Sequence, residues 1–280
     1  MKRPRTLYDK IVDAHVVRPL DAEGAQVLLY IDRTVLNEYT SPQAFSGLRE
    51  AGRRVWRPSA ALGVVDHVNS TAAARTARMP DAGGQAQTDY FARNCADFGI
   101  DLFDILHPMQ GIEHVVMPDV GAIQPGMVIA AGDSHTTTYG AFGALGFGIG
   151  ASDIEHYLAT QTLIYRRLET MRVTVGGRTP LGVGQGHHHG ADPSHRPPGA
   201  AGYAIEFRGE ASRRCRSRPH DRLQHGGGMR RAPALIAPDP KVFDYIEGRP
   251  RAPKGDLWRR AVAAWASLRS DEEARFDEFS

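Results

Sequence analysis

The segment that decides the fold class of this chain is residues 130–140, AAGDSHTTTYG, with the glycine-rich run AFGALGFGIG behind it at 141–150. An apolar stretch leads into an acid, a hydroxyl and an imidazole at Asp133, Ser134 and His135. Because α/β proteins place polar side chains in the loops that follow their strands, this order predicts an α/β fold with a site at a strand end. The run lacks the Gly-Lys-Ser/Thr ending of a phosphate loop, so its glycines indicate close packing instead.

Two similar clusters precede this segment, VDHVNST at residues 65–71 and HPMQGIEH at residues 107–114. They place Asp66 beside His67, and His114 seven residues after His107. A single Asp-His pair is usually a surface or helix-cap pair, but three clusters of this type in one chain indicate acid–base chemistry on a polar substrate. His107 is followed by proline, and we interpret it as part of a turn.

Apolar spacing along the chain alternates between the helical and the strand period, which predicts a layered α/β sheet. Ser41, with proline after it, and Ser152, with Glu155 three residues on, are predicted helix caps. The predicted helices are residues 7–15, 42–51, 85–98, 152–166 and 256–268, and the predicted strands are residues 26–31, 61–65, 101–106, 127–131 and 171–175. Trp258 and Trp265 lie seven residues apart on the last of these helices, where they are predicted core residues.

The composition limits the classes of protein to consider. The 280 residues allow one large or two ordinary domains, and a net charge of +2 gives no electrostatic case for nucleic acid or a membrane surface. No apolar run has the length of a transmembrane helix, and the basic N-terminus lacks the apolar stretch of a signal peptide. We therefore expect a cytoplasmic protein that binds neither nucleic acid nor membrane.

Two stretches, residues 178–200 and 212–231, break the pattern. The first contains the run His187-His188-His189 with several prolines, and the second is rich in arginine and glycine. They are either flexible loops, the first of them a metal-binding tract, or the products of compensated frameshifts. Because both begin and end abruptly and replace expected apolar helices, we favour frameshifts.

Residues 6–17 (TLYDKIVDAHVV), 29–33 (LYIDR) and 40–45 (TSPQAF) join the three clusters in a fixed order. Together they resemble the large subunits of 3-isopropylmalate dehydratase, which belong to the aconitase superfamily. The resemblance implies aconitase-like layered α/β/α domains that are incomplete at the C-terminus. It divides the chain into a first domain at residues 1–177 and a second, disrupted domain at residues 178–280 that carries Glu206.

The resemblance also implies an activity and roles for particular residues. The family's enzymes are hydro-lyases of leucine biosynthesis, which interconvert 2-isopropylmalate and 3-isopropylmalate by removing and re-adding water. Asp66 and His67 match the pair that protonates the departing hydroxyl. The other carried-over residues are His114 paired with Asp133, His135 paired with Glu206, and the substrate contacts Gln43 and Ser134.

The family uses a 4Fe–4S cluster held by three cysteines and a separate small subunit as partner. This chain has two cysteines, Cys95 on a predicted amphipathic helix and Cys215 in the arginine-rich stretch. We therefore expect no metal ligands, no cluster and no dehydratase activity from this chain on its own. The alternatives are a related hydro-lyase acting on homoaconitate or 2-methylmalate, a non-catalytic remnant that retains the small-subunit interface, and a histidine-rich metal-binding protein.

Overall fold

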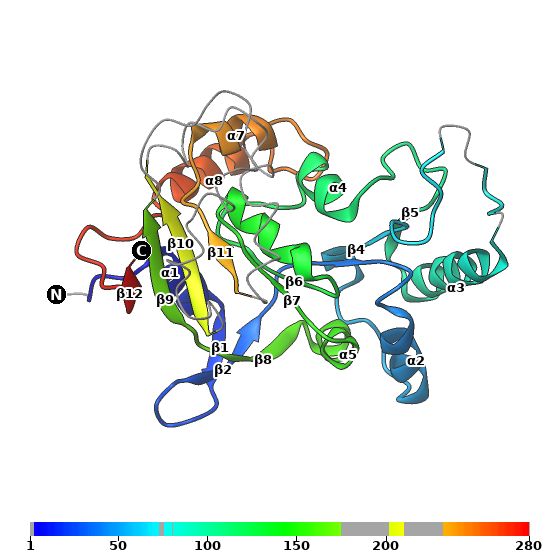
Figure 1. The fold of residues 1–280 in the computed structure, drawn as a ribbon, viewed down its shortest axis with the longest axis horizontal. Coiled ribbons are helices and arrows are strands. Elements are labelled where there is room, and N and C mark those ends of the chain that lie inside the picture. Colours follow the sequence, from blue (N-terminus) through cyan, green and yellow to red (C-terminus); the bar gives the residue numbers. More distant parts are fainter. Residues whose placement is uncertain (1–2, 73–75, 80, 175–201, 210–231, 280) are drawn as a thin grey trace, which may run out of the picture.

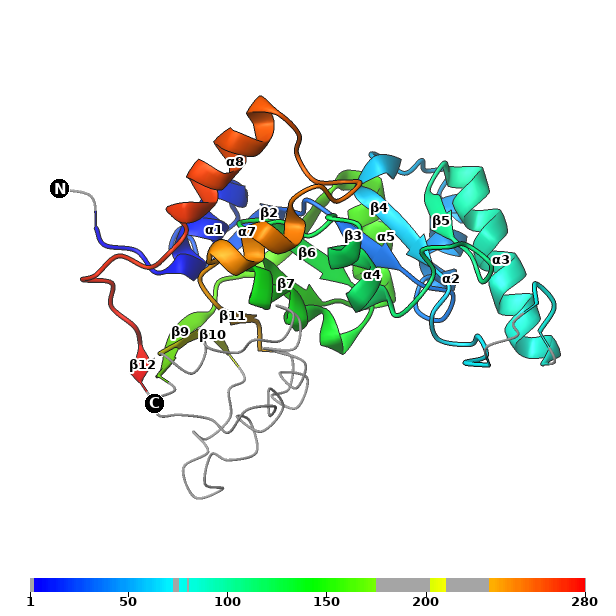
Figure 2. The same cartoon turned by 90° about the horizontal axis from the view of Figure 1, so that it is seen from above.

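The structure is a computed structural model that describes residues 3–72, 76–79, 81–174, 202–209 and 232–279 (Figure 1). Helices and short strands alternate along it, and small parallel sheets lie between helices (Figure 2). The elements in chain order are α1 (Leu7–His15), β1 (Val16–Pro19), β2 (Gln26–Tyr30), β3 (Thr34–Leu36), α2 (Pro42–Glu50), η1 (Pro58–Ala60), β4 (Ala61–Val64), α3 (Ala82–Phe98), β5 (Asp101–Phe103), α4 (Glu113–Asp119), β6 (Val128–Ala131), η2 (Ser134–Phe142), β7 (Leu145–Gly148), α5 (Ala151–Thr160), β8 (Thr162–Arg166), β9 (Glu169–Thr174), β10 (Tyr203–Arg208), β11 (Ala234–Leu235), α7 (Pro240–Ile246), α8 (Asp256–Ala266) and β12 (Glu278–Phe279). The predicted α/β fold is confirmed.

Parallel strands form the centre of the molecule. Strands β3, β4 and β5 make one parallel sheet, and β6 pairs in parallel with β7. A single bridge from Arg33 to Ile129 joins the two sets of strands. Because β4 and β6 are buried along their whole length, their side chains read as continuous apolar runs, as expected for parallel strands covered on both faces.

Two further sheets lie beside this centre. Strands β1, β2 and β8 form an antiparallel sheet, and β11, β10, β9 and β12 form a parallel one. Strand β9 precedes residue 177 and pairs over its full length with β10, which follows it. The described residues on either side of the predicted domain boundary therefore share one sheet, and the division at 177 stays a prediction.

Local sequence explains why the first helix forms where it does. Thr6 and Asp9 make a reciprocal capping box at the start of α1. Leu7, Ile11 and Val12 recur at helical spacing on one face and are buried in the larger of two apolar clusters. Burial of that face against the core stabilises a nine-residue helix that would be marginal alone.

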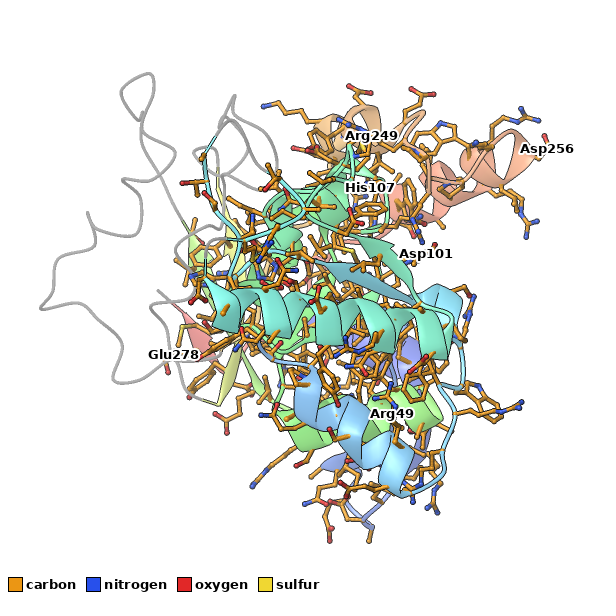
Figure 3. The ribbon with its side chains drawn as sticks, turned by 90° about the vertical axis from the view of Figure 1, so that its right-hand side faces the viewer. Arg49, Asp101, His107, Arg249, Asp256 and Glu278 are labelled. Carbon is orange, nitrogen blue, oxygen red and sulfur yellow. The ribbon has the colours of Figure 1, made fainter. Side chains whose placement is uncertain are left out.

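Helix α3 packs on a face of the β3–β4–β5 sheet and contacts α2, and Figure 3 views the molecule from the side of these two helices. Arg49 of α2 donates hydrogen bonds to Asn94 Oδ1 and to Asp97 Oδ2 of α3, each at 2.5 Å. On the buried side of α3, Cys95 packs against the strand that carries Gly63, where an added Cβ would lie 2.9 Å from the sulfur. The prediction that Cys95 is a small buried apolar residue is confirmed.

The predicted helix at residues 152–166 is wrong in its second half. Helix α5 begins after Gly150, without a cap from Ser152, and ends at Gln161, whose φ of 62° is left-handed. Residues 162–166 then form β8, which pairs with β2 in register from Thr162–Tyr30 to Arg166–Gln26. Burial alternates along most of β8, as expected for a strand with one face toward the core. The pairing with β2 therefore determines the structure of these residues, although their apolar spacing favours a helix.

Smaller differences concern the ends of elements. Helix α3 begins three residues earlier than predicted because Asp81 caps it through Gly84 N–H. Ser41 is the N-cap residue of α2 with Pro42 at the first helical position, as predicted, but its hydroxyl donates to the carbonyl of Asn37 and makes no capping hydrogen bond. Strand β5 ends at Phe103, since Asp104 and His107 form a turn, as interpreted for His107.

The C-terminal helices pack onto the second apolar cluster. Trp265 is 6% exposed in that cluster, and Trp258 packs against it with the two rings edge to face. The core role predicted for both tryptophans is confirmed. Within the described residues, no helix is both long and apolar enough to cross a membrane.

Candidate active site

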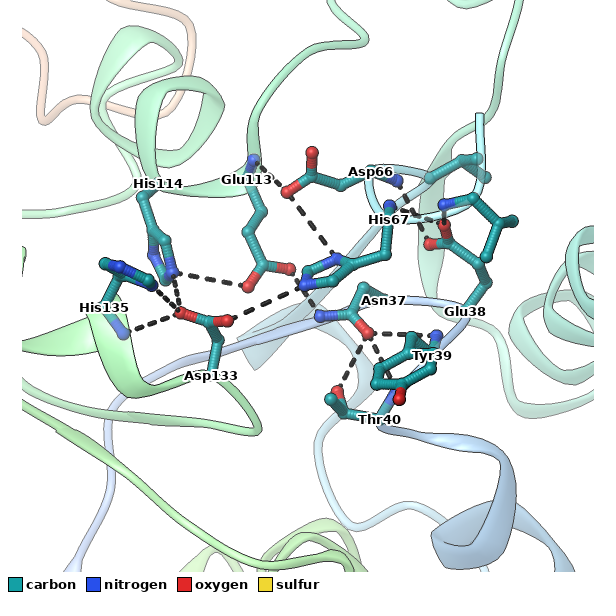
Figure 4. Close-up of polar contacts among 12 residues, drawn as sticks. Asn37, Glu38, Tyr39, Thr40, Asp66, His67, Glu113, His114, Asp133 and His135 are labelled. Atoms are coloured by element: carbon teal, nitrogen blue, oxygen red, sulfur yellow. Dashed lines mark hydrogen bonds and ion pairs between the residues drawn. The ribbon is translucent and has the colours of Figure 1, made fainter. Parts of the chain in front are cut away.

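Four strand and helix ends converge on one group of polar side chains (Figure 4). The turn after β3 supplies residues 37–40, the end of β4 supplies Asp66 and His67, and the start of α4 supplies Glu113 and His114. The end of β6 supplies Asp133, which caps η2, and His135. Because parallel strands end at the same edge, residues far apart in the sequence meet there.

Asp133 is the centre of this group. Its Oδ1 lies 2.9 Å from His114 Nε2 and 3.0 Å from His135 Nδ1, and it accepts the His135 backbone N–H at 2.6 Å. Its Oδ2 lies 3.6 Å from His67 Nε2. The hydrogen bond from His114 and the contact with His67 hold the pKa of Asp133 far below its usual range, so this carboxylate stays ionised.

His67 carries a proton at neutral pH. The contact with Asp133 is the main cause that raises the pKa of His67 to about 9, against the opposing effect of partial burial. The nearby Glu113 and Asp66 raise it further, and Asp66 Oδ2 lies 3.8 Å from His67 Nδ1. Tyr39 stacks on the ring at a centroid distance of 5.9 Å, yet the His67 side chain remains 29% exposed and accessible to a ligand.

His114 has partners at both ring nitrogens. Its Nε2 faces Asp133, and its Nδ1 lies 3.0 Å from the hydroxyl of Tyr139. Tyr139 is fully buried, and burial raises its pKa well above the usual value, so the phenol keeps its proton. This arrangement fixes the His114 ring between a carboxylate and a phenol.

Glu113 was not predicted from the sequence. Its side chain is 1% exposed, its Oε2 accepts a hydrogen bond from Asn37 Nδ2 at 2.9 Å, and its Oε1 lies 3.5 Å from His114 Nε2. Burial raises the pKa of Glu113 above its usual value, partly offset by the charge of His114. The signal available in the sequence was its place next to His114, since a helix that presents a histidine to a site can also present the preceding side chain.

Glu38 was not predicted from the sequence either. It contacts the backbone of the site loop and not the side chains of the other site residues. It is fully buried and accepts the N–H groups of Asp66, His67 and Val68 at 3.1, 2.6 and 2.7 Å. Three charge-assisted hydrogen bonds fix the loop that carries Asp66 and His67. Nothing in the local sequence marks a buried glutamate for this task.

Close packing of the glycine-rich run places η2 against β7. A Cβ at Gly146 would lie 2.2 Å from the carbonyl oxygen of Thr136, and one at Gly148 would lie 2.9 Å from that of Asp133. Only glycine permits this approach. The interpretation of the run as a packing device beside the site is supported by these two positions.

An open pocket of about 300 Å³ adjoins the group on the side of Asp66. Asn69, Ser70 and Thr71 line it from one side, and Gln110 and Ile112 from the other. Amide and hydroxyl groups of this kind can receive the oxygen atoms of a small polar substrate.

The structure brings five of the predicted site residues together, and these are Asp66, His67, His114, Asp133 and His135. Gln43, on the first turn of α2, is exposed, and so is Ser134, which stands between Asp133 and His135 in the chain.

The predicted pairing of His135 with Glu206 is not found in the described part of the chain. Glu206 is 4% exposed on β10, where it accepts hydrogen bonds from Arg208 Nε at 2.7 Å and from the Ser270 hydroxyl. His135 contacts Asp133 instead. The physical reason is that the Glu206 carboxylate already has two donors, Arg208 of β10 and Ser270 in the segment between α8 and β12.

Cys95, the one cysteine in the described part of the chain, does not fit a 4Fe–4S cluster. Such clusters are held by thiolates, and burial raises the pKa of the Cys95 thiol to about 12. Cys95 lies on the buried face of α3 in the apolar core, and Cys215 lies outside the described residues. No step of the chemistry below is therefore assigned to a cluster.

Comparison with known proteins agrees with this geometry. A family described as "Aconitase family (aconitate hydratase)" matches residues 9–280. The chain is 56% identical over 284 residues to "3-isopropylmalate dehydratase large subunit 2" of Salmonella choleraesuis and, equally, of Salmonella typhimurium. It is 53% identical over 290 residues to "3-isopropylmalate dehydratase large subunit 1" of Mannheimia succiniciproducens.

Each of these alignments covers 98% of this chain and 58% of the relative. The chain therefore spans little more than half the length of the curated relatives that it matches. The resemblance inferred from the ordered motifs is confirmed.

Proposed function

The chain belongs to the aconitase family, and we propose that it forms the histidine–carboxylate part of a 3-isopropylmalate dehydratase large subunit. The reaction is a hydro-lyase reaction, in which 2-isopropylmalate and 3-isopropylmalate interconvert by loss and re-addition of water. The observation that carries the proposal is the position of Asp133, one ionised carboxylate in contact with three imidazoles from separate elements.

Dehydration of a hydroxy acid needs a proton for the departing hydroxyl, and a base must remove a proton from the neighbouring carbon. We assign the first task to His67, because it is protonated, partly exposed and next to Asp133. As the C–O bond breaks, the proton of His67 joins the hydroxyl to give water, and Asp133 and Asp66 stabilise the ring before transfer. In the hydration direction, neutral His67 takes a proton from water as the new C–O bond forms.

His114 and His135 differ in what they can do for a substrate. Both nitrogens of His114 are engaged, so it acts as a positioning residue that fixes the orientation of Asp133. The His135 side chain is 58% exposed and uses only Nδ1 for Asp133, which leaves Nε2 for a substrate oxygen. We assign the removal of the carbon-bound proton to none of these three histidines.

The proposal includes the partner and setting that the relatives' names imply. The named relatives are large subunits, so a small subunit is the expected partner. Any cluster would depend on cysteines other than Cys95, and a cytoplasmic location stays a prediction. Homoaconitate and 2-methylmalate remain the competing substrates, because the pocket lining does not distinguish their side chains from isopropylmalate.

A chimera tests the proposal without depending on the cysteines of this chain. Residues 3–174 would replace the corresponding part of the Salmonella typhimurium large subunit, and the product would be assembled with its small subunit. We expect the chimera to hydrate the isopropyl-substituted enoic acid, and the loss of ultraviolet absorbance of this acid measures the rate. The enoic acids related to homoaconitate and 2-methylmalate should be hydrated more slowly. A chimera that folds and binds the small subunit but hydrates none of the three acids would overturn the lyase proposal and favour the non-catalytic remnant.

A further inference from the structure

One carboxylate oxygen of the group around Asp133 has no hydrogen-bond partner among the described residues. Glu113 Oε1 is buried, whereas the other oxygen of the same carboxylate is held by Asn37 Nδ2 at 2.9 Å. A buried carboxylate oxygen left without a donor costs about 1–3 kcal/mol. This unpaired oxygen points toward the side chains of His114 and Asp133 (Figure 4).

The ligand-type atoms around it have the spacing of a metal site. Glu113 Oε1 lies 3.5 Å from His114 Nε2, which lies 2.9 Å from Asp133 Oδ1, and the three residues each offer one ligand atom within 4.8 Å of the others. Ligands about 2.0–2.2 Å from a tetrahedral zinc ion lie about 3.3–3.5 Å from one another. The 3.5 Å between Glu113 Oε1 and His114 Nε2 matches this spacing, and the 2.9 Å between His114 Nε2 and Asp133 Oδ1 would have to lengthen by a few tenths of an ångström.

The residues behind these ligands are the kind that orient metal ligands. A histidine that binds through Nε2 must carry its proton on Nδ1, and Tyr139 OH lies 3.0 Å from His114 Nδ1 to accept it. Asn37 fixes the Glu113 carboxylate from behind. Two carboxylates and one neutral imidazole also balance the charge of a divalent ion.

We propose that Glu113 Oε1, His114 Nε2 and Asp133 Oδ1 form a mononuclear site for a divalent transition-metal ion such as Zn²⁺ or Co²⁺. Nitrogen and oxygen ligands of this kind suit these ions. The remaining coordination position would take water or a substrate oxygen, and His67 lies beside the ligand set, with its Nε2 3.6 Å from Asp133 Oδ2. The site uses no cysteine, so its ligands do not depend on an iron–sulfur cluster.

The proposal does not depend on which reaction the chain catalyses. The ion and the proton-transfer network use the same atoms of Asp133 and His114, so binding of the ion competes with the hydrogen bond between them. An excess of Zn²⁺ is therefore expected to inhibit any turnover that relies on this network.

The test is titration of the metal-free 280-residue chain with Co²⁺, followed by visible absorption and calorimetry. All variants would carry His187→Ala, His188→Ala and His189→Ala, since that histidine run is a second place where Co²⁺ could bind. We expect one equivalent of Co²⁺ with the visible bands of four- or five-coordinate cobalt, displaced by Zn²⁺. Glu113→Gln is expected to weaken binding by more than about tenfold, with Glu50→Gln, an exposed residue of α2, as the matched control.

Tyr139→Phe keeps the size of a buried ring and removes only the group behind His114, so a smaller loss of affinity is expected from it. It also covers the case in which Glu113→Gln does not fold. Circular dichroism and a melting curve would establish the fold of each variant. The proposal is overturned if the parent binds no Co²⁺ at millimolar concentration, or if folded Glu113→Gln and Tyr139→Phe both bind as tightly as the parent.

Discussion

The region around Asp133 and the region around Glu206 both contain an acid that the family resemblance marks as functional, yet their surroundings differ. Asp133 lies at the end of β6 among three imidazoles, and part of its side chain faces solvent. Glu206 lies within β10, where Arg208 and Ser270 satisfy it. A carboxylate in contact with titratable groups can take part in proton transfer, whereas one fixed by an arginine and a hydroxyl has its acceptors occupied. We therefore expect a catalytic role for Asp133 and a structural role for Glu206, although the family resemblance marks both.

Asp133→Asn gives the largest expected effect and tests the comparison directly. Loss of the charge lowers the pKa of His67 and frees the His114 ring, so the hydration rate of the chimera described above should fall by about 100-fold or more. Glu206→Gln in the full chain is the matched change, and it should lower the unfolding free energy while leaving the pKa of His67 unchanged. A Glu206→Gln chain in which the pKa of His67 falls as far as it does in Asp133→Asn would contradict the distinction.

Gly146→Ala probes the packing that sets the position of Asp133. The added Cβ would lie 2.2 Å from a backbone oxygen of η2, so we expect unfolding free energy to fall by about 3 kcal/mol. Urea denaturation would measure it. Gly83→Ala, on the first turn of α3, meets only the flexible Asp81 side chain at 3.3 Å and should be neutral or slightly stabilising.

Ser270→Ala tests the structural role of the Glu206 region. The Ser270 hydroxyl donates to Glu206 and accepts the Leu7 N–H at 2.7 Å, so its removal leaves a buried acceptor and a buried donor without that partner. We expect a loss of about 2 kcal/mol in unfolding free energy with no change in the pKa of His67. Ser267→Ala, which removes an exposed hydroxyl, is the control, and an equal loss there would show that the Glu206 contact is unimportant.

His15 and Asp32 form a His–Asp pair outside the site, with Nε2 and Oδ2 2.8 Å apart. Burial lowers the pKa of His15, but the hydrogen bond and charge of Asp32 and the Ile11 carbonyl together raise it above 6.5. Because the pKa of His15 is higher in the folded than in the unfolded chain, its protonated ring stabilises the fold fully at pH values below the unfolded pKa. This contribution is lost as the pH rises through the pKa of the folded state.

His15→Gln should therefore cost about 1 kcal/mol at about pH 5.5 and much less at about pH 9, measured as the difference in unfolding free energy between the parent and the variant. Comparison at each pH cancels the titration of other groups. A difference that grows with pH would show that the pair is not stabilising through the charged imidazole.

The sequence determined the α/β class, the position of α1 and the strands that end at Asp66 and Asp133, because apolar spacing and caps are local signals. It also identified five of the residues that meet in the site, through the order of its motifs. The N-cap at Asp81 was likewise readable from the chain, although we placed the start of α3 three residues late.

Only the tertiary structure decided the rest. Pairing with β2 turned residues 162–166 into a strand. The fold also buried Glu38 and Glu113 in the site, although no neighbour in the sequence marks Glu38 and only the adjacent His114 marks Glu113. The partners of Glu206 and His135 were likewise fixed by which donors the fold placed beside them. The physical reason is the same in each case: hydrogen-bond partners and desolvation come from residues distant in the chain, and no local pattern specifies them.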